Sequence, residues 1–448
     1  MDSADTDTLF SPPDALQSRY VALTLLGQCL DQQKPLDQLL DNDTALLRLD
    51  SRDRAFVRAI VLTALRHLGQ VDDIIRRSVE RPDQKIQPAH LHHLLRVAVT
   101  QLVFLDVPPH AAVNTAVDIC DRLGLMRLKG FVNAILRRVA QSGKAITGTQ
   151  DAARLNTPSW LLESWIKTYG LQVAIKTCEA NMIEPDLDLT IRDQSQLAYW
   201  AETLGAQILP NGTLRRYDGG AVPDFPGFSA GTWWVQEAAA SLAAPLLKPQ
   251  AGDVILDMCA APGGKAAQLA ASGATVVAMD RSASRMRLLR DNMARLGLEE
   301  LVTQTIADAA TWRAAHQAQF TKILIDAPCS ATGTLRRQPD TAWLKLPQDV
   351  DRLAAVQARI LENAVALLAP GGTLVYCTCS LQAAEGEDQI AALLAKDKTM
   401  IRVPIQPEEV PGLTDALNVN RELRIMPWMW PDLGGVDGFF ISRLRKLH

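Results

Sequence analysis

The chain has 448 residues, of which 48% are hydrophobic and 21% charged, with a formal net charge of −4. These values are ordinary for folded globular proteins, and the length favours two or three domains. Because the net charge is slightly negative, any nucleic-acid binding must come from local basic patches.

The same inventory argues against several classes of protein. No apolar run approaches the ~20 residues that span a bilayer, so we expect no membrane contact. The seven cysteines are an odd number and no signal peptide is recognisable, which favours reduced thiols and a cytoplasmic protein. Cysteines and histidines do not occur at zinc-site spacing, and we therefore expect no metal.

The first third of the chain carries the pattern of helices. Few β-type alternations occur before Lys144, so we expect an all-helical domain over residues 13–143 and a linker over 140–150. Apolar residues recur at helical spacing over residues 14–32, 52–68, 89–105, 111–123 and 128–139.

Residues 151–232 predict a small α/β subdomain. A helical pattern covers 158–169, and strand-like alternation covers 186–192 and, more weakly, 206–209. A Gly- and Pro-rich stretch at 211–231 follows. Since this segment is too short to bury a sizeable core by itself, we expect it to lean on the domain that follows, which we place at residues 233–448.

The third segment predicts an α/β domain, opening with a helix from Trp233 to about Leu247. Residues 254–258 then form a short apolar run, typical of a buried strand, and Asp257 lies at its end. A small-residue turn and a further helix follow, an arrangement that points backbone N–H groups at a ligand. Neither G-x-G-x-x-G nor G-K-[ST] is present, which weakens the dinucleotide and P-loop interpretations.

Four more apolar runs predict strands that alternate with helices. Asp280, Asp308 and Asp326 each follow one of them, and Cys377 to Ser380 follow the next. In a doubly wound parallel sheet, ligands bind at the carboxyl ends of the strands, and an acid such as Asp280 is suited to ribose hydroxyls. Residues 438–444 predict a final strand.

Three spaced motifs carry a specific resemblance. They read D-M-C-A-A-P-G-G-K at 257–265, D-A-P-C-S-A-T-G-T at 326–334 and Y-C-T-C-S at 376–380. From about residue 156 onward the chain resembles the RNA cytosine-5 methyltransferases of the Sun/NOL/NOP group. The stretches beginning at Asp53, Val107 and Lys129 resemble the NusB family of RNA-binding domains.

The resemblance implies an architecture and a reaction. It implies an all-α NusB-like domain, a linking subdomain, and a Rossmann-like class I methyltransferase domain with a mostly parallel seven-stranded sheet. The implied reaction is S-adenosylmethionine-dependent methylation of carbon 5 of a cytosine in RNA, with 16S ribosomal RNA as the expected substrate. We expect a monomer.

The resemblance also implies the roles of individual residues. Carbon 5 of cytosine is a poor nucleophile until a thiolate adds to carbon 6, so the chemistry needs an activated cysteine. Cys379 is the implied nucleophile, Cys329 the residue for product release, Asp326 the acid or hydrogen-bond partner of the ring, and Lys265 a neighbour of cofactor and substrate. The implied cofactor-binding residues are Asp257, Cys259, Ala260, Ala261, Pro262, Gly263, Gly264, Lys265, Asp280, Asp308 and Asp326.

Several alternatives remain open at this level. DNA cytosine-5 methyltransferases use a Pro-Cys cysteine as nucleophile, which would favour Cys329, and Cys377 is predicted to pack in the core rather than to bind metal. Two rival functions remain. One is the same reaction on another RNA, such as tRNA. The other is a binding protein for transcription antitermination, with a vestigial catalytic part. The chain also has Gln236-Glu237 where the family usually has Gln-Asp, and Ile191-Arg192-Asp193 where it has R-V-N.

Two sets of basic residues are candidates for RNA contact. No Asp or Glu occurs between Arg122 and Lys144, and although a basic run is usually a solvated face, an RNA enzyme downstream favours phosphate contacts. The candidates are Arg127, Lys129, Arg137 and Arg138 in that run, and Arg336 and Arg337 after the Cys329 segment.

Overall fold

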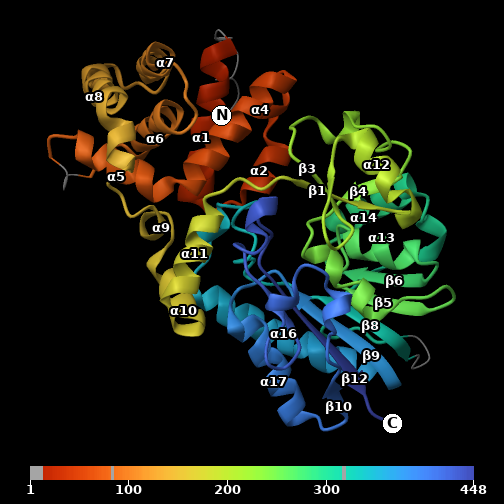
Figure 1. Ribbon diagram of the computed structural model, residues 1–448. Helices are drawn as coiled ribbons and strands as arrows, with labels where there is room; N and C mark the ends of the chain where they lie inside the picture. Colours follow the sequence, from red (N-terminus) through yellow and green to blue (C-terminus); the bar gives the residue numbers. More distant parts are fainter. Residues whose placement is uncertain (1–13, 82–84, 315–318) are drawn as a thin grey trace, which may run out of the picture. The chain divides into compact units, whose positions relative to one another are not determined.

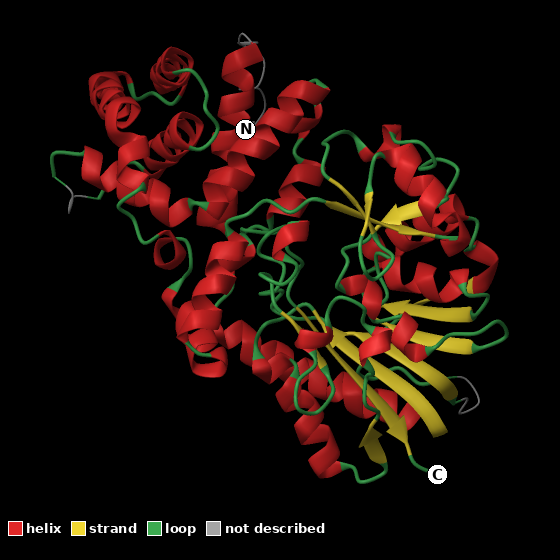
Figure 2. Cartoon of the chain, viewed as in Figure 1, coloured by secondary structure: helices red, strands yellow, loops and turns green. Residues whose placement is uncertain are grey.

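The computed structural model describes residues 14–81, 85–314 and 319–448. The chain forms two compact units (Figures 1 and 2). One contains the residues up to Glu163 together with Gln338–Leu344, and the other contains Ser164–Arg337 and Lys345–His448. Residues 151–163, which we assigned to the linking subdomain, thus belong to the first unit, and residue 13 lies outside the described part.

The first unit is helical, as predicted. Its core is built from the apolar faces of α1, α4, α5, α6, α7 and α8, including Leu26, Ile60, Leu95 and Leu136. The helices are α1 (Asp14–Gln32), α2 (Leu36–Asn42), α3 (Thr44–Leu47), α4 (Ser51–Arg66), α5 (Leu68–Ser78), α6 (Ala89–Val103), α7 (Pro109–Arg122), α8 (Lys129–Thr147) and α9 (Ala152–Leu155), with α15 (Thr341–Leu344) from the distant segment.

Two features of this unit differ from the sequence prediction. The expected linker at 140–150 is wrong over most of its length, because α8 continues to Thr147. Gly143 lies in its buried face, where an added Cβ would come within 2.9 Å of the Val103 side chain, so α6 and α8 pack closely there. The segment Gln338–Leu344 joins this unit through the indole of Trp343, which donates to the Leu65 carbonyl at 2.9 Å.

The second unit begins with α10 (Ser159–Tyr169, whose last turns belong here) and α11 (Leu171–Asn181), followed by a small antiparallel sheet. The strand order is β2-β3-β1-β4. Leu189, Ile191 and Trp233 of this sheet pack against Trp200 of α12 (Leu197–Leu204). The strands are β1 (Leu187–Ile191), β2 (Gln207–Ile208), β3 (Leu214–Arg216) and β4 (Trp233–Val235).

The helix predicted from Trp233 to about Leu247 is wrong. Trp233–Val235 is the strand β4 and pairs with β1, as suits two aromatic residues and a valine. The chain then makes only two short 3-10 turns, at Ala240–Leu242 and Pro245–Leu247. The Glu237 carboxylate accepts hydrogen bonds from the backbone N–H groups of Ala239 and Ala240, which caps this tight turn.

The larger sheet confirms the predicted mostly parallel, Rossmann-like architecture, although in the described residues it has eight strands and not the expected seven, because β11 adds to β12. Its order is β10-β12-β9-β8-β5-β6-β7, with β11 paired to β12. β7, β6, β5, β8 and β9 run parallel, whereas β12 runs antiparallel to β9. The strands are β5 (Val254–Met258), β6 (Thr275–Asp280), β7 (Val302–Ile306), β8 (Phe320–Asp326), β9 (Leu368–Thr378), β10 (Met400–Arg402), β11 (Leu423–Ile425) and β12 (Phe439–Lys446).

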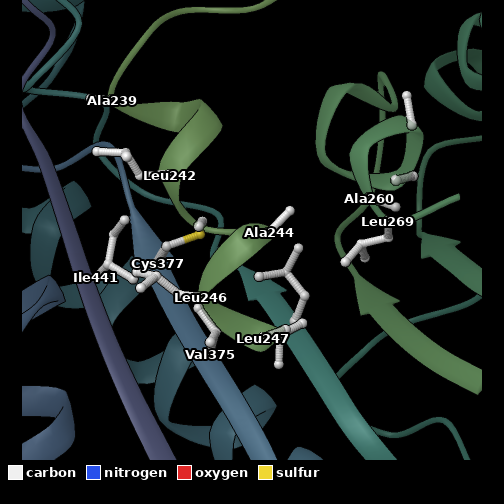
Figure 3. Close-up of a cluster of buried hydrophobic side chains, with 14 of the residues drawn as sticks. Ala239, Leu242, Ala244, Leu246, Leu247, Ala260, Leu269, Val375, Cys377 and Ile441 are labelled. Atoms are coloured by element: carbon white, nitrogen blue, oxygen red, sulfur yellow. The ribbon is translucent and has the colours of Figure 1, made fainter. Parts of the chain in front are cut away.

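Helices cover this sheet and bury both faces. The principal ones are α13 (Gly264–Ala271), α14 (Ala283–Leu296), α16 (Pro347–Leu367) and α17 (Glu387–Lys396). Figure 3 shows part of the core on one face, where Leu246 and Leu247 pack near Val375 and Ile441, with the Cys377 side chain among them. Within the described ranges, no helix is both long and apolar enough to cross a membrane.

Candidate active site

The site residues converge because the carboxyl ends of adjacent parallel strands meet at one edge of the sheet. Asp257 is the penultimate residue of β5, Asp280 ends β6, and Asp326 ends β8, directly opposite Cys377 of β9. Two turns extend this edge: the one after β5, and the one after β9 that carries Cys379. Chain positions that are more than 100 residues apart are thereby brought together.

Lys265 and Asp326 form an ion pair at this edge. Lys265 lies in the first turn of α13, and its Nζ donates to Asp326 Oδ2 at 2.8 Å. Burial alone would lower the pKa of Lys265, but the Asp326 carboxylate raises it above its usual range. Lys265 is therefore a fixed positive charge, and it also lies 5.2 Å from the centre of the Phe439 ring.

The two candidate cysteines lie side by side. Their Sγ atoms are 3.2 Å apart, a hydrogen-bonding distance for two sulfurs, and both residues are half-buried. This hydrogen bond lowers the pKa of Cys329 and raises the pKa of Cys379. Of the two thiols, Cys329 therefore loses its proton more readily.

Cys377 is a packing residue, as the sequence predicted. Its side chain is buried, and burial raises its pKa well above the usual range. Its thiol donates to Asp326 Oδ1 at 3.6 Å, so it also helps to orient that carboxylate. Among the described residues, no group of three or more His, Cys, Asp or Glu side chains could hold a metal ion.

The turn between β5 and α13 has the features of a ligand cradle. Both carboxylate oxygens of Asp257 are buried and have no hydrogen-bond partner within the described part of the chain. Burial raises the pKa of Asp257 well above its usual range. Gly263 has φ of +110°, and a Cβ there would meet the Leu289 and Met293 side chains at 3.1 Å. A ligand with hydrogen-bond donors would satisfy Asp257 and fit this backbone.

The remaining turn residues and strand-end acids have different surroundings. Cys259 has a positive φ of +65°, and burial raises its pKa. The Asp280 carboxylate accepts from the Ser282 N–H at 2.9 Å and lies 3.3 Å from Arg285 Nη1. Asp308 is exposed, and its Oδ1 accepts from the Ala310 N–H at 2.9 Å, which makes it a turn cap. In the turn after β5, Ala260 and Ala261 are buried, and Pro262 follows them in the chain before Gly264.

The structure argues against Arg336 and Arg337 as phosphate contacts. Arg336 is 1% exposed and donates to the Gly434 carbonyl. Arg337 Nε donates to Asp437 at 2.9 Å, within a buried group of charges that also includes Asp188. Both guanidinium groups are used inside the fold, so the prediction for Arg336 is wrong and that for Arg337 loses its basis.

The basic run of the helical unit is only partly available to a ligand. Lys129 pairs with Asp121 at 2.6 Å, and Arg138 donates to the Ser78 carbonyl and to Glu80. Arg127 and Arg137 are exposed. These two remain candidates for contact with RNA.

One buried carboxylate near the thiols is not predicted by the sequence. Glu385 is buried and accepts hydrogen bonds from Ser330 and Ser380, the residues that directly follow Cys329 and Cys379. It lies six residues after Cys379 in a polar stretch, a pattern typical of the exposed N-terminus of a helix. Only the fold brings it beneath both cysteines.

Comparison with known proteins identifies two family regions. The model of the family described as "16S rRNA methyltransferase RsmB/F" matches residues 244–445, and that of the NusB family matches 16–141. Three curated relatives are each named "Ribosomal RNA small subunit methyltransferase B". They come from Serratia proteamaculans (33% identity, covering 96% of this chain and 98% of the relative), Sodalis glossinidius (35%, 96% and 97%) and Vibrio cholerae (34%, 96% and 98%).

Solved structures support the fold. The crystal structure of PH0851 has a TM-score of 0.73 at 22% identity and covers 98% of this chain and 100% of that one. A methyltransferase homolog from Pyrococcus horikoshii has a TM-score of 0.54 at 26% identity, covering 66% of this chain and 97% of that one. With relatives at 33–35% identity over nearly its whole length, the chain belongs to the RsmB/F family of S-adenosylmethionine-dependent rRNA methyltransferases.

Proposed function

We propose that the protein methylates carbon 5 of a cytosine in 16S ribosomal RNA through a covalent adduct between Cys379 and carbon 6. The observation that carries the proposal is the pair of thiols 3.2 Å apart, next to the Lys265–Asp326 ion pair. A reaction in which cysteine acted only as the nucleophile would need only one cysteine at this site. Two adjacent cysteines suit a reaction that must both form and break a carbon–sulfur bond.

The side chains have complementary roles in this scheme. As the Cys379 sulfur bonds to carbon 6, its proton leaves to water, either directly or by way of the hydrogen bond to Cys329, whose pKa that hydrogen bond lowers. The electrons of the 5,6 double bond move into the ring, where Asp326 and Lys265 hold the polar edge of the cytosine. Carbon 5 is then nucleophilic.

Release of the product requires the reverse movement of electrons. A base removes the proton from carbon 5, the double bond re-forms, and the carbon–sulfur bond breaks to return the electron pair to Cys379. Cys329 is the nearest candidate for this base because its sulfur lies beside the one that leaves. Once its proton has passed to solvent, Cys329 can accept another.

The cradle after β5 suits the methyl donor. S-adenosylmethionine, when bound, supplies an electrophilic methyl group. Asp257 and Asp280 would hold the polar groups of this cofactor, and the backbone of residues 259–264 would face it. Asp308 caps a turn and contributes at most at the edge.

The test is transfer of a tritiated methyl group from labelled cofactor to purified 16S rRNA, tRNA and DNA. We expect label in 16S rRNA only, recovered as 5-methylcytidine after digestion, and bisulfite sequencing then locates the nucleotide. Label confined to tRNA would favour the rival substrate. Absence of transfer to every nucleic acid would contradict an enzymatic role and leave the binding function in antitermination.

Asp280→Ala is expected to weaken cofactor binding by ~1–3 kcal/mol, the scale of a lost hydrogen bond to a charged group. The carboxylate is buried at the end of β6 and is already oriented by Ser282. Calorimetric titration with S-adenosylmethionine measures the effect, with Asp291→Ala on the exposed face of α14 as control. Equal affinities in the two folded variants would remove Asp280 from the site.

Reversing two charges, Arg127→Glu with Arg137→Glu, is expected to raise the apparent KM for RNA severalfold and to lower the salt slope of binding by about 1 for each phosphate that the protein no longer binds. Both side chains are exposed on the helical unit. The matched control is Arg48→Glu with Arg58→Glu, which changes the net charge equally at another exposed part of that unit. If both pairs of substitutions act alike, the effect is one of net charge and not of a specific contact.

A further inference from the structure

Glu385 joins the two segments that carry the cysteines. Its Oε1 accepts from the Ser330 N–H at 2.9 Å, and its Oε2 accepts from the Ser380 hydroxyl at 2.5 Å and from the Ser330 hydroxyl. Ser330 follows Cys329 and Ser380 follows Cys379 in the chain. One carboxylate therefore spans the two residues next to the thiols, which belong to different loops.

The surroundings of Glu385 show that this arrangement is built into the fold. Glu385 and both serines are fully buried. Gln357 of α16 donates to Glu385 Oε1 at 3.0 Å and to the Pro328 carbonyl at 2.9 Å, so the residue before Cys329 is held by the same network. Tyr376 of β9 donates to the Glu385 carbonyl at 2.6 Å, which fixes the Glu385 backbone.

A second contact holds the far end of the Cys329 loop. The Gly333 N–H donates to the Cys379 carbonyl at 2.8 Å, and a Cβ at Gly333 would come within 2.7 Å of that oxygen. The loop is thus fixed at Gly333, four residues after Cys329. Glu385 fixes its other end at Ser330, directly beside the thiol. Without Glu385, the Ser330 N–H would lose its acceptor, and beside the thiols the longer contact between the Ser330 and Ser380 hydroxyls, 3.2 Å apart, would remain.

We propose that Glu385 is a positioning residue that sets the distance between the Cys329 and Cys379 thiols, and so controls breakdown of the RNA adduct. It touches neither thiol and acts through the two serines. The proposal rests on the cysteine roles given under the proposed function. Attack by Cys379 needs one sulfur at carbon 6, whereas release needs both sulfurs at the same cytosine ring. Release is therefore the step that is more sensitive to the distance between the two sulfurs.

The distance between the thiols can be measured without RNA. Hydrogen peroxide at stoichiometric amount oxidises two thiols to a disulfide: each sulfur gives up one proton and one electron, and the peroxide is reduced to two molecules of water. Because the two Sγ atoms start 3.2 Å apart, the parent should form the Cys329–Cys379 disulfide readily. Glu385→Ala should form it roughly 10-fold or more slowly, as expected for a displacement on the 1 Å scale.

Glu385→Gln provides the conservative comparison. Glutamine keeps an acceptor for the Ser330 N–H and replaces only the oxygen shared by the serine hydroxyls, so its oxidation rate should lie between those of the parent and of Glu385→Ala. Glu422→Gln is the matched control, since Glu422 is also buried and accepts from a serine hydroxyl, but from that of Ser442 and not from a residue next to the thiols. It should oxidise like the parent even if its melting temperature falls.

The same variants can be followed with RNA. Glu385→Ala should retain the parent's KM for RNA within about twofold but lower kcat, and should accumulate a covalent protein–RNA species during turnover. The oxidation rates decide the proposal: if Glu385→Ala oxidises as fast as Glu422→Gln below its melting temperature, Glu385 only stabilises the fold. If Cys329→Ala accumulates no RNA adduct, the proposed function is contradicted, while the oxidation rates would still decide the role of Glu385.

Discussion

Cys379→Ala is expected to abolish methylation and to leave no covalent RNA adduct, whereas Cys329→Ala should accumulate one. The first substitution removes the sulfur that bonds to carbon 6. The second leaves attack intact and removes the partner that assists release. Denaturing gel electrophoresis with labelled RNA measures both, because only a covalent protein–RNA species survives it.

Cys377→Ala is the control for this pair. Its thiol is buried and contacts Asp326 at 3.6 Å, so it should keep its activity to within about tenfold, the range expected on removing a weak hydrogen bond. The opposite pattern, with the trapped species in Cys379→Ala and none in Cys329→Ala, would assign the nucleophile to Cys329. The lowered pKa of Cys329 makes this a real alternative, because it is the readier thiolate before RNA binds.

Much of the larger sheet could be predicted from the chain because its strands are short apolar runs that end in a distinctive residue. Residues 254–258, 302–306 and 438–444 fall on β5, β7 and β12 with little error. β5 and β12 are buried along most of their length, so their apolar composition indicates a strand, whereas β7 lies at the edge of the sheet and buries only Val302. The strand ends then place Asp257, Asp280 and Asp326 at one edge by topology alone.

The wrong predictions share a physical cause: in each, a tertiary contact determined the structure that the segment adopts. Trp233–Val235 has an apolar pattern that suits a helix as well as a strand, and pairing with β1 selected the strand. Residues 140–147 look like a linker because they are small and polar, yet Gly143 is what allows α8 to pack on α6. Arg336 lies beside a catalytic motif in sequence and points into the fold.

Glu385 and Arg215 represent a class that the sequence conceals altogether. Both are charged residues in stretches that read as surface, and charged residues are almost never fully buried unless they are paired. Their partners are distant in sequence or are backbone atoms: Glu385 binds Ser330, and Arg215 binds the carbonyls of Leu433 and Gly435. No local periodicity predicts such a pair.

Arg215→Leu is expected to lower the free energy of unfolding by about 3–5 kcal/mol, because it leaves the buried Asp188 carboxylate with Arg337 at 3.7 Å in place of its close partner. Both side chains are 1% exposed, and Nε and Nη2 of Arg215 donate to the two Asp188 oxygens at 2.7 and 2.8 Å. Arg215 Nη1 also donates to the carbonyls of Leu433 and Gly435. The residue therefore joins β3 and β1 to the turn before β12.

Two comparisons separate the buried charge from the loss of the side chain. The double variant Asp188→Leu with Arg215→Leu should lose less stability than Arg215→Leu alone, since no unpaired charge remains. Arg352→Leu removes an ion pair whose arginine is 71% exposed, and should cost at most about 1 kcal/mol. Urea unfolding followed by tryptophan fluorescence measures all three. A loss in Arg215→Leu no larger than in Arg352→Leu would mean that the buried pair does not hold the small sheet to the methyltransferase sheet.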